Sequence, residues 1–208
     1  MTFAGCVSQI RGNPYAWFMP SVGMRVIALL AAVVTTAVMS ACGSASPPSD
    51  TQSTKHNAAD VTFARKMIPH HQQAIDMAAM VPSRTTNPQL IIMAKHIALD
   101  QQAQIDTLQE LLRDWGEPAA PDHMAHDGTG MAGMVDAATM DKLPTLKGAE
   151  FDDLWLQSMI SHHQGAVAMA EPEIAQGQNP TAVKMAKIIV EWQQFEIDQM
   201  HGMMGPSE

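Results

Sequence analysis

Two matching clusters of methionine and histidine hold the side chains of this 208-residue chain that are best suited to bind a metal ion. Residues 67–72 read Met-Ile-Pro-His-His-Gln, and 92 positions later residues 159–164 read Met-Ile-Ser-His-His-Gln. The thioether of methionine and the imidazole of histidine are soft or borderline ligands, and together they favour copper over hard cations. A repeat at a fixed spacing indicates one structural unit used twice, so the sequence predicts two related metal-binding halves.

A helical wheel predicts that both clusters face inward. At about 100° per residue, His70 and His71 share an apolar stripe with Met67, whereas Pro69 and Gln73 lie on the opposite side. The second copy behaves in the same way. A single inward histidine is more often a hydrogen-bonded core residue than a ligand, but two symmetric clusters favour metal binding. The predicted ligands are Met67, His70, His71, Met77, Met159, His162, His163 and Met169.

The second helix of each repeat is predicted to support the imidazoles. Its inward stripe contains Asp100 and Gln104 in the first copy, and Trp192 and Glu196 in the second. An amide or carboxylate in such a stripe can accept the free N–H of a liganding imidazole and so orient the ring. The alternative is a buried polar network that fixes the register of the bundle. The residues predicted to act behind the ligands are Asp100, Gln104 and Glu196.

Two further groups of methionine and histidine lie outside the repeat match. One falls in a linker at 116–135, where a flexible glycine-rich chain can wrap an ion, although such a linker can also carry these residues incidentally. The other lies at the end of the chain. These accessory metal candidates are His123, Met124, His126, Met131, Met134, His201 and Met204.

Each repeat has the pattern of a helical hairpin. The second helix of each hairpin begins at an Asn-Pro pair, at 87–88 and at 179–180, with asparagine as N-cap and proline in the first turn. No alternating pattern is long enough for a strand. Two such hairpins predict an all-α four-helix bundle. The predicted boundaries are 58–204 for the bundle, 58–115 and 150–204 for the repeats, 116–135 for the linker and roughly 136–150 for a helical lead-in.

The N-terminus carries the pattern of an export signal. An apolar run at 26–39 follows Arg25 and is too short to span a bilayer comfortably. It ends in Met-Ser-Ala-Cys, which resembles a bacterial lipobox, so we expect a lipid at Cys42 that anchors the chain to the extracytoplasmic or periplasmic side of the cell membrane. An ordinary signal peptide is the alternative. The predicted segments are 1–41 for an N-terminal extension plus signal peptide, with translation starting at Met24, and 42–57 for a flexible tether.

The chain is acidic, with a formal net charge of −9. From Cys42 onward it has 10 Lys and Arg residues against 21 Asp and Glu, which argues against a nucleic acid partner and suits the attraction of cations. All 9 histidines and 14 of the 18 methionines lie in this part. If Cys42 is acylated, the exported part has no free thiol, and methionine and histidine are its soft ligands.

The doubled segment resembles the hallmark of the bacterial family known as domain of unknown function 305, DUF305. That hallmark, Met-x-x-His-His-x-x-Ala-x-x-Met-Ala, matches residues 67–78 and 159–170, and a later Gln-x-x-Glu-Ile segment matches 193–197. The first copy has Gln104 where the family usually shows glutamate. The resemblance covers roughly 58–204. It implies an exported helical bundle of ferritin-like topology, and some members are similar to periplasmic copper-binding proteins.

These observations predict a non-catalytic, membrane-anchored protein that sequesters or delivers copper as Cu(I) or Cu(II), with other transition metals as alternatives. The protein that donates or accepts the metal is not identified by the sequence. A ferritin-like di-metal oxidase is a second hypothesis, but its Glu-x-x-His motifs are absent and Asp198-x-x-His201 is the nearest approach. A metal-free interaction bundle is a third, and it requires the four clustered histidines to be satisfied by protein hydrogen bonds.

Overall fold

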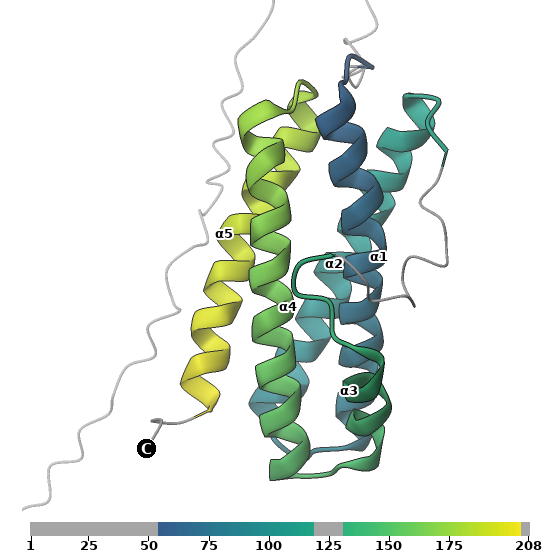
Figure 1. Ribbon diagram of the computed structural model, residues 1–208. Coiled ribbons are helices and arrows are strands. Elements are labelled where there is room, and N and C mark those ends of the chain that lie inside the picture. Colours follow the sequence, from purple (N-terminus) through teal and green to yellow (C-terminus); the bar gives the residue numbers. More distant parts are fainter. Residues whose placement is uncertain (1–53, 119–130, 205–208) are drawn as a thin grey trace, which may run out of the picture. The chain divides into compact units, whose positions relative to one another are not determined.

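The structure is a computed structural model that describes residues 54–118 and 131–204 (Figure 1). No helix in these ranges is long and apolar enough to cross a membrane. The predictions that fall outside them concern the signal peptide, Met24, Cys42, most of the tether, His123, Met124 and His126.

Five α-helices and no strand occur in the described ranges, which confirms the predicted all-α class. Helix α1 packs along α2, and α4 packs along α5, so each repeat forms a hairpin (Figure 1). The hairpins meet mainly through α1 and α4, whereas α2 and α5 contact each other only slightly. The helices are α1 (Ala58–Met80), α2 (Pro88–Asp114), α3 (Ala137–Lys142), α4 (Ala149–Gln176) and α5 (Pro180–Met203), with 3-10 turns η1 (Val81–Ser83) and η3 (Leu143–Thr145).

Asparagine side chains start three of the long helices. Asn87 and Asn179 each accept hydrogen bonds from two backbone N–H groups of the first turn and precede a proline, which confirms the predicted starts of α2 and α5. Asn57 caps α1, and Asp60 completes the capping box by accepting the Asn57 N–H at 2.6 Å. The chain leaves α2 through Gly116, whose φ of 70° is a left-handed conformation that glycine adopts without strain.

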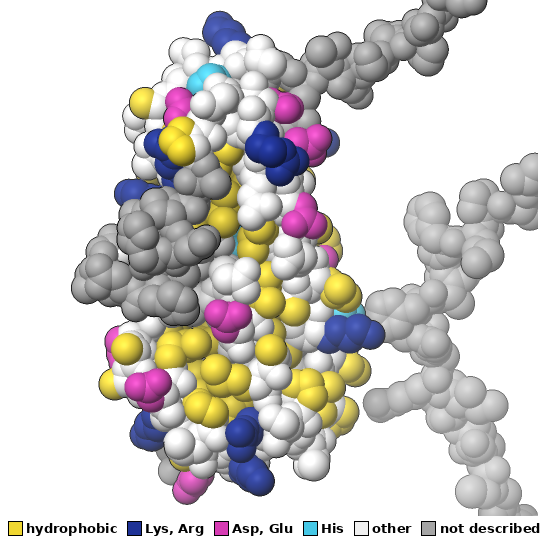
Figure 2. Space-filling view, turned by 90° about the vertical axis from the view of Figure 1, so that its right-hand side faces the viewer, with side chains coloured by type: hydrophobic (Ala, Val, Ile, Leu, Met, Phe, Trp, Pro, Cys, Tyr) yellow, Lys and Arg dark blue, Asp and Glu magenta, His cyan; other side chains and the backbone are white. Residues whose placement is uncertain are grey.

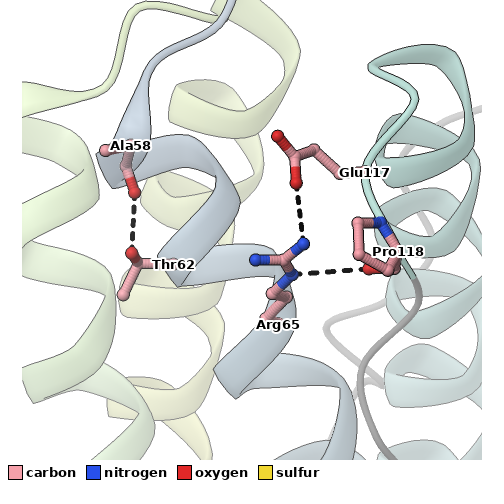
Figure 3. A network of polar contacts seen from close by, with 5 residues as sticks. All are labelled: Ala58, Thr62, Arg65, Glu117 and Pro118. Carbon is pink, nitrogen blue, oxygen red and sulfur yellow. Dashed lines mark hydrogen bonds and ion pairs between the residues drawn. The ribbon is translucent and has the colours of Figure 1, made fainter.

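A single arginine fastens the end of α2 to α1. Arg65 Nη2 donates to Glu117 Oε2 at 2.7 Å, and its Nε donates to the carbonyl of Pro118 at 3.3 Å (Figure 3). One turn earlier in α1, Thr62 Oγ1 donates to the Ala58 carbonyl at 2.7 Å. Because the ion pair is partly exposed, it contributes roughly 0–1 kcal/mol, and its main effect is to fix where the chain departs from α2.

A polar layer divides the apolar core into two clusters. On α1, Met67 belongs to one cluster and Ala74 to the other. On α4 the order is reversed, because Met159 joins the cluster of Ala74 and Ala166 joins that of Met67. The two inner helices are therefore antiparallel. The residues between the clusters on both helices are the four histidines, so the imidazoles form a layer across the middle of the bundle.

A buried pair of carboxyl groups joins the start of α1 to the turn between α4 and α5. Asp60 is fully buried and accepts hydrogen bonds from the backbone N–H groups of Asn57, Gln178 and Asn179 at 2.6 to 3.1 Å. Burial alone would raise the pKa of Asp60, but these bonds lower it below its usual value. Burial raises the pKa of Glu173 to about 8, and the neighbouring Asp60 adds to the shift, so Glu173 is protonated at neutral pH.

Replacing Glu173 with glutamine should remove a loss of stability at high pH. The unfolded chain releases this proton near pH 4.5, while the folded chain keeps it up to about pH 8. The free energy of unfolding therefore falls as the pH rises through that window, by up to about 1.4 kcal/mol per pH unit. Glu173→Gln cannot ionise, so urea denaturation from about pH 5 to 9 should show a flatter decline. The exposed neighbour Glu171→Gln is the control, and identical slopes in both variants would contradict the carboxyl pair.

Candidate metal centre

Four buried histidines occupy the middle of the bundle. His70 and His71 come from α1, His162 and His163 come from α4, and all are fully buried. The rings of His70 and His162 face each other across the α1–α4 contact with centroids 3.7 Å apart, and each lies 6.4 Å from the ring of its sequence neighbour. The inward orientation predicted by the helical wheel is confirmed.

The outer histidine of each pair is held by the second helix of its own hairpin. His71 Nε2–H donates to Gln104 Oε1 at 2.6 Å, and His163 Nε2–H donates to Glu196 Oε2 at 2.9 Å. Because each of these bonds uses the Nε2–H, it leaves Nδ1 of the ring without a hydrogen-bond partner among the described residues. Asp100, predicted for the same role, has no hydrogen bond or ion pair with a histidine in residues 54–118 and 131–204. That part of the prediction is wrong, because Asp100 is exposed in the lining of an open groove between α2 and α5.

The inner pair of histidines is less completely satisfied. His70 Nε2–H donates to the carbonyl of Ala132 at 3.1 Å, which again leaves Nδ1 with a lone pair. His162 has no hydrogen-bond partner for either ring nitrogen. Together with Nδ1 of the two outer rings, five buried ring nitrogens lack a partner among the described residues. A buried polar atom without a hydrogen-bond partner destabilises the fold by about 1–3 kcal/mol. These nitrogens therefore lower the stability of the bundle, and they remain available as metal ligands.

Burial keeps His70, His71 and His162 neutral. It lowers the pKa of His70 to about 3, helped by repulsion from His71 and opposed by the Ala132 carbonyl. It also lowers the pKa of His71 to about 3, against the effect of the hydrogen bond to Gln104. Burial, followed by repulsion from His70, holds the pKa of His162 well below its usual 6.5. A neutral imidazole is the form that ligates a metal, so these rings need not lose a proton before binding near pH 7.

Residues 131–135, here named the crossing segment, cover one side of the histidine layer (Figure 1). Beyond the bond from His70 to Ala132, Val135 N–H donates to Gln73 Oε1 at 2.8 Å, and Gln73 Nε2 donates to the Val135 carbonyl at 2.9 Å. The prediction that Gln73 faces outward is wrong because the crossing segment covers that side of α1. Pro69, predicted on the same outer side, is also buried.

Two glycines let the crossing segment lie directly on the backbone of α4. A Cβ on Gly165 would overlap the carbonyl of Ala132, and a Cβ on Gly133 would lie 2.6 Å from the carbonyl oxygen of Ser161. Gly165 is the repeat counterpart of Gln73, so both copies use this position to receive the same segment. The sequence analysis did not include these glycines in the site. The available signal was a glycine inside a helix, which costs about 1 kcal/mol relative to alanine and indicates a close approach.

The methionines fall into two sets relative to the imidazole layer. Met67 and Met159 are fully buried one turn before the inner histidine of their helix, on opposite sides of the layer. Met77 and Met169 each lie seven residues beyond that histidine, which is about 10 Å along the helix axis. Met169 is only partly buried and lines a separate hollow with Phe63. The structure therefore brings Met67 and Met159 to the layer and leaves Met77 and Met169 away from it.

An open groove between α2 and α5 reaches the side chains that hold the outer histidines. It has a volume of about 430 Å³, and its lining includes Gln104 and Glu196. Gln101 and Gln193, which are repeat counterparts, are almost fully buried in the same lining. Both amide atoms of Gln101 and the amide oxygen of Gln193 lack hydrogen-bond partners. The groove therefore offers polar atoms along a route from solvent to the back of the imidazole layer.

Several residues singled out from the sequence lie at or near the surface. Trp192, expected to face inward, is 56% exposed in the lining of this groove, because α2 and α5 touch too little to cover it. His201 and Met204 are exposed at the end of α5. Met131 and Met134 are partly buried on the crossing segment. The structure does not bring these accessory candidates into the histidine layer.

The candidate metal ligands lie near one another, but they do not converge on one point. In residues 54–118 and 131–204, no three His, Cys, Asp or Glu side chains are placed to share one metal ion. An ion in the layer must therefore combine imidazoles from both helices with a thioether, or shift a ring. What fits a soft metal is the chemistry of the donor set, which consists of neutral nitrogens without other partners and sulfur atoms one turn away.

Fold and centre together define a class of protein, a duplicated helical hairpin with a buried layer of neutral imidazoles between its inner helices. The chain belongs to the family described as Domain of unknown function (DUF305), whose model matches residues 60–204. The resemblance drawn from the doubled histidine segment is thereby confirmed. No curated protein matches this sequence.

Solved structures that are similar to this chain share its fold. A candidate secreted DUF305 protein from Streptomyces coelicolor is 35% identical with a TM-score of 0.63, over 70% of this chain and 91% of that chain. A DUF305 fragment from Deinococcus radiodurans is 33% identical with a TM-score of 0.66, over 72% and 97%. CopM in its Cu(II)-bound form is 34% identical with a TM-score of 0.62, over 69% and 94%. CopM is also known in Cu(I)-bound, Ag-bound and apo forms.

Acid should destabilise the chain through its buried imidazoles. Unfolded histidine titrates near 6.5, whereas His70 and His71 take up a proton in the folded chain only near pH 3. Between these values the unfolded state binds more protons, so the free energy of unfolding falls as the pH falls, by up to about 1.4 kcal/mol per pH unit for each such histidine. Urea denaturation at about pH 7, 6 and 5 measures the slope. His71→Gln should reduce it and the exposed His201→Gln should not; equal slopes would argue against neutral buried rings.

Gly165→Ala should displace the crossing segment. The added methyl overlaps the Ala132 carbonyl, so the segment must lift and release its bond to His70, at a cost of roughly 1–3 kcal/mol. Gly202→Ala adds the same methyl to α5 where nothing lies within 4 Å, and it should be neutral or stabilise by about 0.5–1 kcal/mol. Thermal unfolding of both variants makes the comparison. Equal melting temperatures for the two would mean that the crossing segment is not held against α4.

Proposed function

We propose that this chain is an exported, non-catalytic copper-binding protein that sequesters copper or passes it on through its imidazole layer. The observation that carries the proposal is the set of five buried ring nitrogens that have no hydrogen-bond partner in residues 54–118 and 131–204. A bundle that needed only packing would lose stability by retaining them, because apolar side chains of similar size avoid the penalty. A bound cation supplies the missing partner to several nitrogens at once.

The donor set favours copper among the common metals. Neutral nitrogen and sulfur are the preferred donors of Cu(I), and imidazole also suits Cu(II). Hard cations such as Ca²⁺ and Mg²⁺ need several oxygen ligands, but the oxygens described at the layer, those of Glu196, Gln104 and Ala132, are already bonded to histidines. The copper-bound forms of CopM, a relative at 34% identity in its Cu(II) form, support the same choice for this chain.

The groove between α2 and α5 gives the metal a route to the layer. Asp100 and Glu196 place negative charge along it, which attracts cations, and Gln104 and Glu196 connect it to the outer rings. When an imidazole ligates a metal, an acceptor on its other nitrogen holds the ring in place and strengthens it as a donor. Glu196 does this with a full negative charge that also offsets the charge of the ion.

The two other hypotheses are less well supported by the geometry. A di-metal oxidase needs carboxylates that bridge the metals, but the nearest sequence match, at Asp198 and His201, is exposed on α5. A metal-free interaction bundle requires saturated histidines, and neither nitrogen of His162 has a hydrogen-bond partner in the part of the chain that the structure describes. The proposal extends to location. A lipid on Cys42 and a tether at 42–57 would hold the bundle outside the cell membrane, in keeping with the candidate secreted relative.

Removing the inner imidazoles should abolish tight copper binding. The full chain and a His70→Gln/His162→Gln variant are titrated with Cu(I) against a chromogenic chelator. We expect the variant to lose more affinity than the roughly 10–100-fold that removal of a supporting hydrogen-bond partner costs, and Glu196→Gln to show a loss within that range. Met67→Leu/Met159→Leu, which conserves volume, should weaken Cu(I) more than Cu(II) because only the thioethers are lost.

Controls separate loss of ligands from loss of fold. His201→Gln replaces an exposed histidine and should bind copper as the wild type does. Copper should also raise the thermal midpoint of the wild type, since a ligand that binds only the folded state stabilises it. Wild-type affinity in a folded His70→Gln/His162→Gln variant, or no copper binding by the wild type, would overturn the proposal.

A further inference from the structure

A third Met-x-x-His pair lies outside the imidazole layer. This spacing occurs in the two buried clusters and once more, at Met93 and His96 on α2, and nowhere else in the chain. Residues three apart on a helix are neighbours on its surface, so the two side chains share a face. The repeat counterpart of His96 is Ile188, so the duplication does not account for this histidine. A local role has to explain it.

Met93 and His96 line a hollow of about 450 Å³ between α2 and the end of α5. Met203 and Gly202 line the same hollow from α5. Met93 is only 6% exposed, Met203 is partly buried, and His96 is exposed. The hollow thus runs from the apolar core to solvent. Met93 lies at its buried end, His96 at its exposed end and Met203 at an intermediate depth.

The surroundings of the hollow are neutral and partly apolar. Its lining contains no carboxylate, and the polar groups besides His96 are the amides of Gln89 and Gln199. Ile92 forms part of the lining and is 57% exposed. Hydrophobic side chains also gather on the lower half of the face in Figure 2, toward the end of the bundle where α2 begins. His96 has no hydrogen bond or ion pair with any described residue, so its ring is available to a ligand.

We infer that this hollow binds one soft monovalent cation, Cu(I) or Ag(I), through the thioethers of Met93 and Met203 and the imidazole of His96. A neutral set of two sulfurs and one nitrogen selects soft ions and offers hard cations nothing they prefer. Since the hollow opens to solvent, an ion held here exchanges more readily than one in the buried layer. The inference does not depend on the proposed function of that layer.

Silver titration of the full chain tests the inference directly. The chain is labelled with ¹³C in its methionine methyl groups and titrated with silver nitrate in chloride-free buffer. We expect the Met93 and Met203 signals, assigned from single Met→Leu variants, to shift together. His96→Gln/Met203→Leu should retain about one Ag(I) fewer per chain than the wild type after gel filtration. Circular dichroism confirms that its helices are intact.

Two further chains make the outcome decisive. His201→Gln/Met204→Leu removes the same residue types at the end of α5 outside the hollow, and it should bind as many ions as the wild type. In His70→Gln/His162→Gln the Met93 and Met203 signals should still shift, which would keep the hollow as a site even if the buried layer bound no copper. The inference is overturned if His96→Gln/Met203→Leu retains as much Ag(I) as the wild type, or if the shifts vanish without the buried histidines.

Discussion

The removal of four imidazoles from water is the constraint on which the rest of this structure depends. A histidine ring carries one donor and one acceptor, and burial makes its charged form unfavourable, so each ring must be neutral and must find partners inside the protein. Gln104, Glu196 and the carbonyl of Ala132 each take one N–H. These groups accept the N–H of three rings. No described residue donates a hydrogen bond to the ring nitrogens that carry no proton. The fold thus orients the rings and leaves their lone pairs unused.

The two copies of the repeat differ on the side of the histidine layer that the crossing segment covers. One segment has to serve both inner helices, so the duplicated positions that receive it cannot stay identical. Gln73 bonds to it through its amide, whereas its counterpart Gly165 has no side chain and admits its backbone. The neighbouring mismatch of Pro69 with Ser161 lies on the same side, since the Ser161 carbonyl is next to Gly133. These two differences between the repeats therefore lie where a single chain segment breaks the symmetry.

Periodicity predicted the helical class, the hairpins and the inward histidines, because each depends on local spacing along one helix. The asparagine caps were equally legible, since an Asn-Pro pair acts within a single turn. The predictions that were wrong depended on contacts between segments that are distant in the sequence. The helical wheel places Gln73 outside, but residues 131–135 cover it. It places Trp192 inside, but Trp192 lines the groove between α2 and α5. Met77 and Met169 share a helical face with the histidines. A helical wheel does not show position along the helix axis, and along it each methionine lies about 10 Å from the inner histidine of its helix.

The pair Gln104 and Glu196 indicates that the two halves of the centre are not equivalent. Both accept the Nε2–H of an outer histidine, yet one is a neutral amide and the other a carboxylate. A carboxylate behind an imidazole strengthens it as a donor and compensates the charge of a bound ion, whereas an amide only orients it. The two halves of the centre therefore differ in the charge behind their imidazoles, which is negative beside His163 and neutral beside His71.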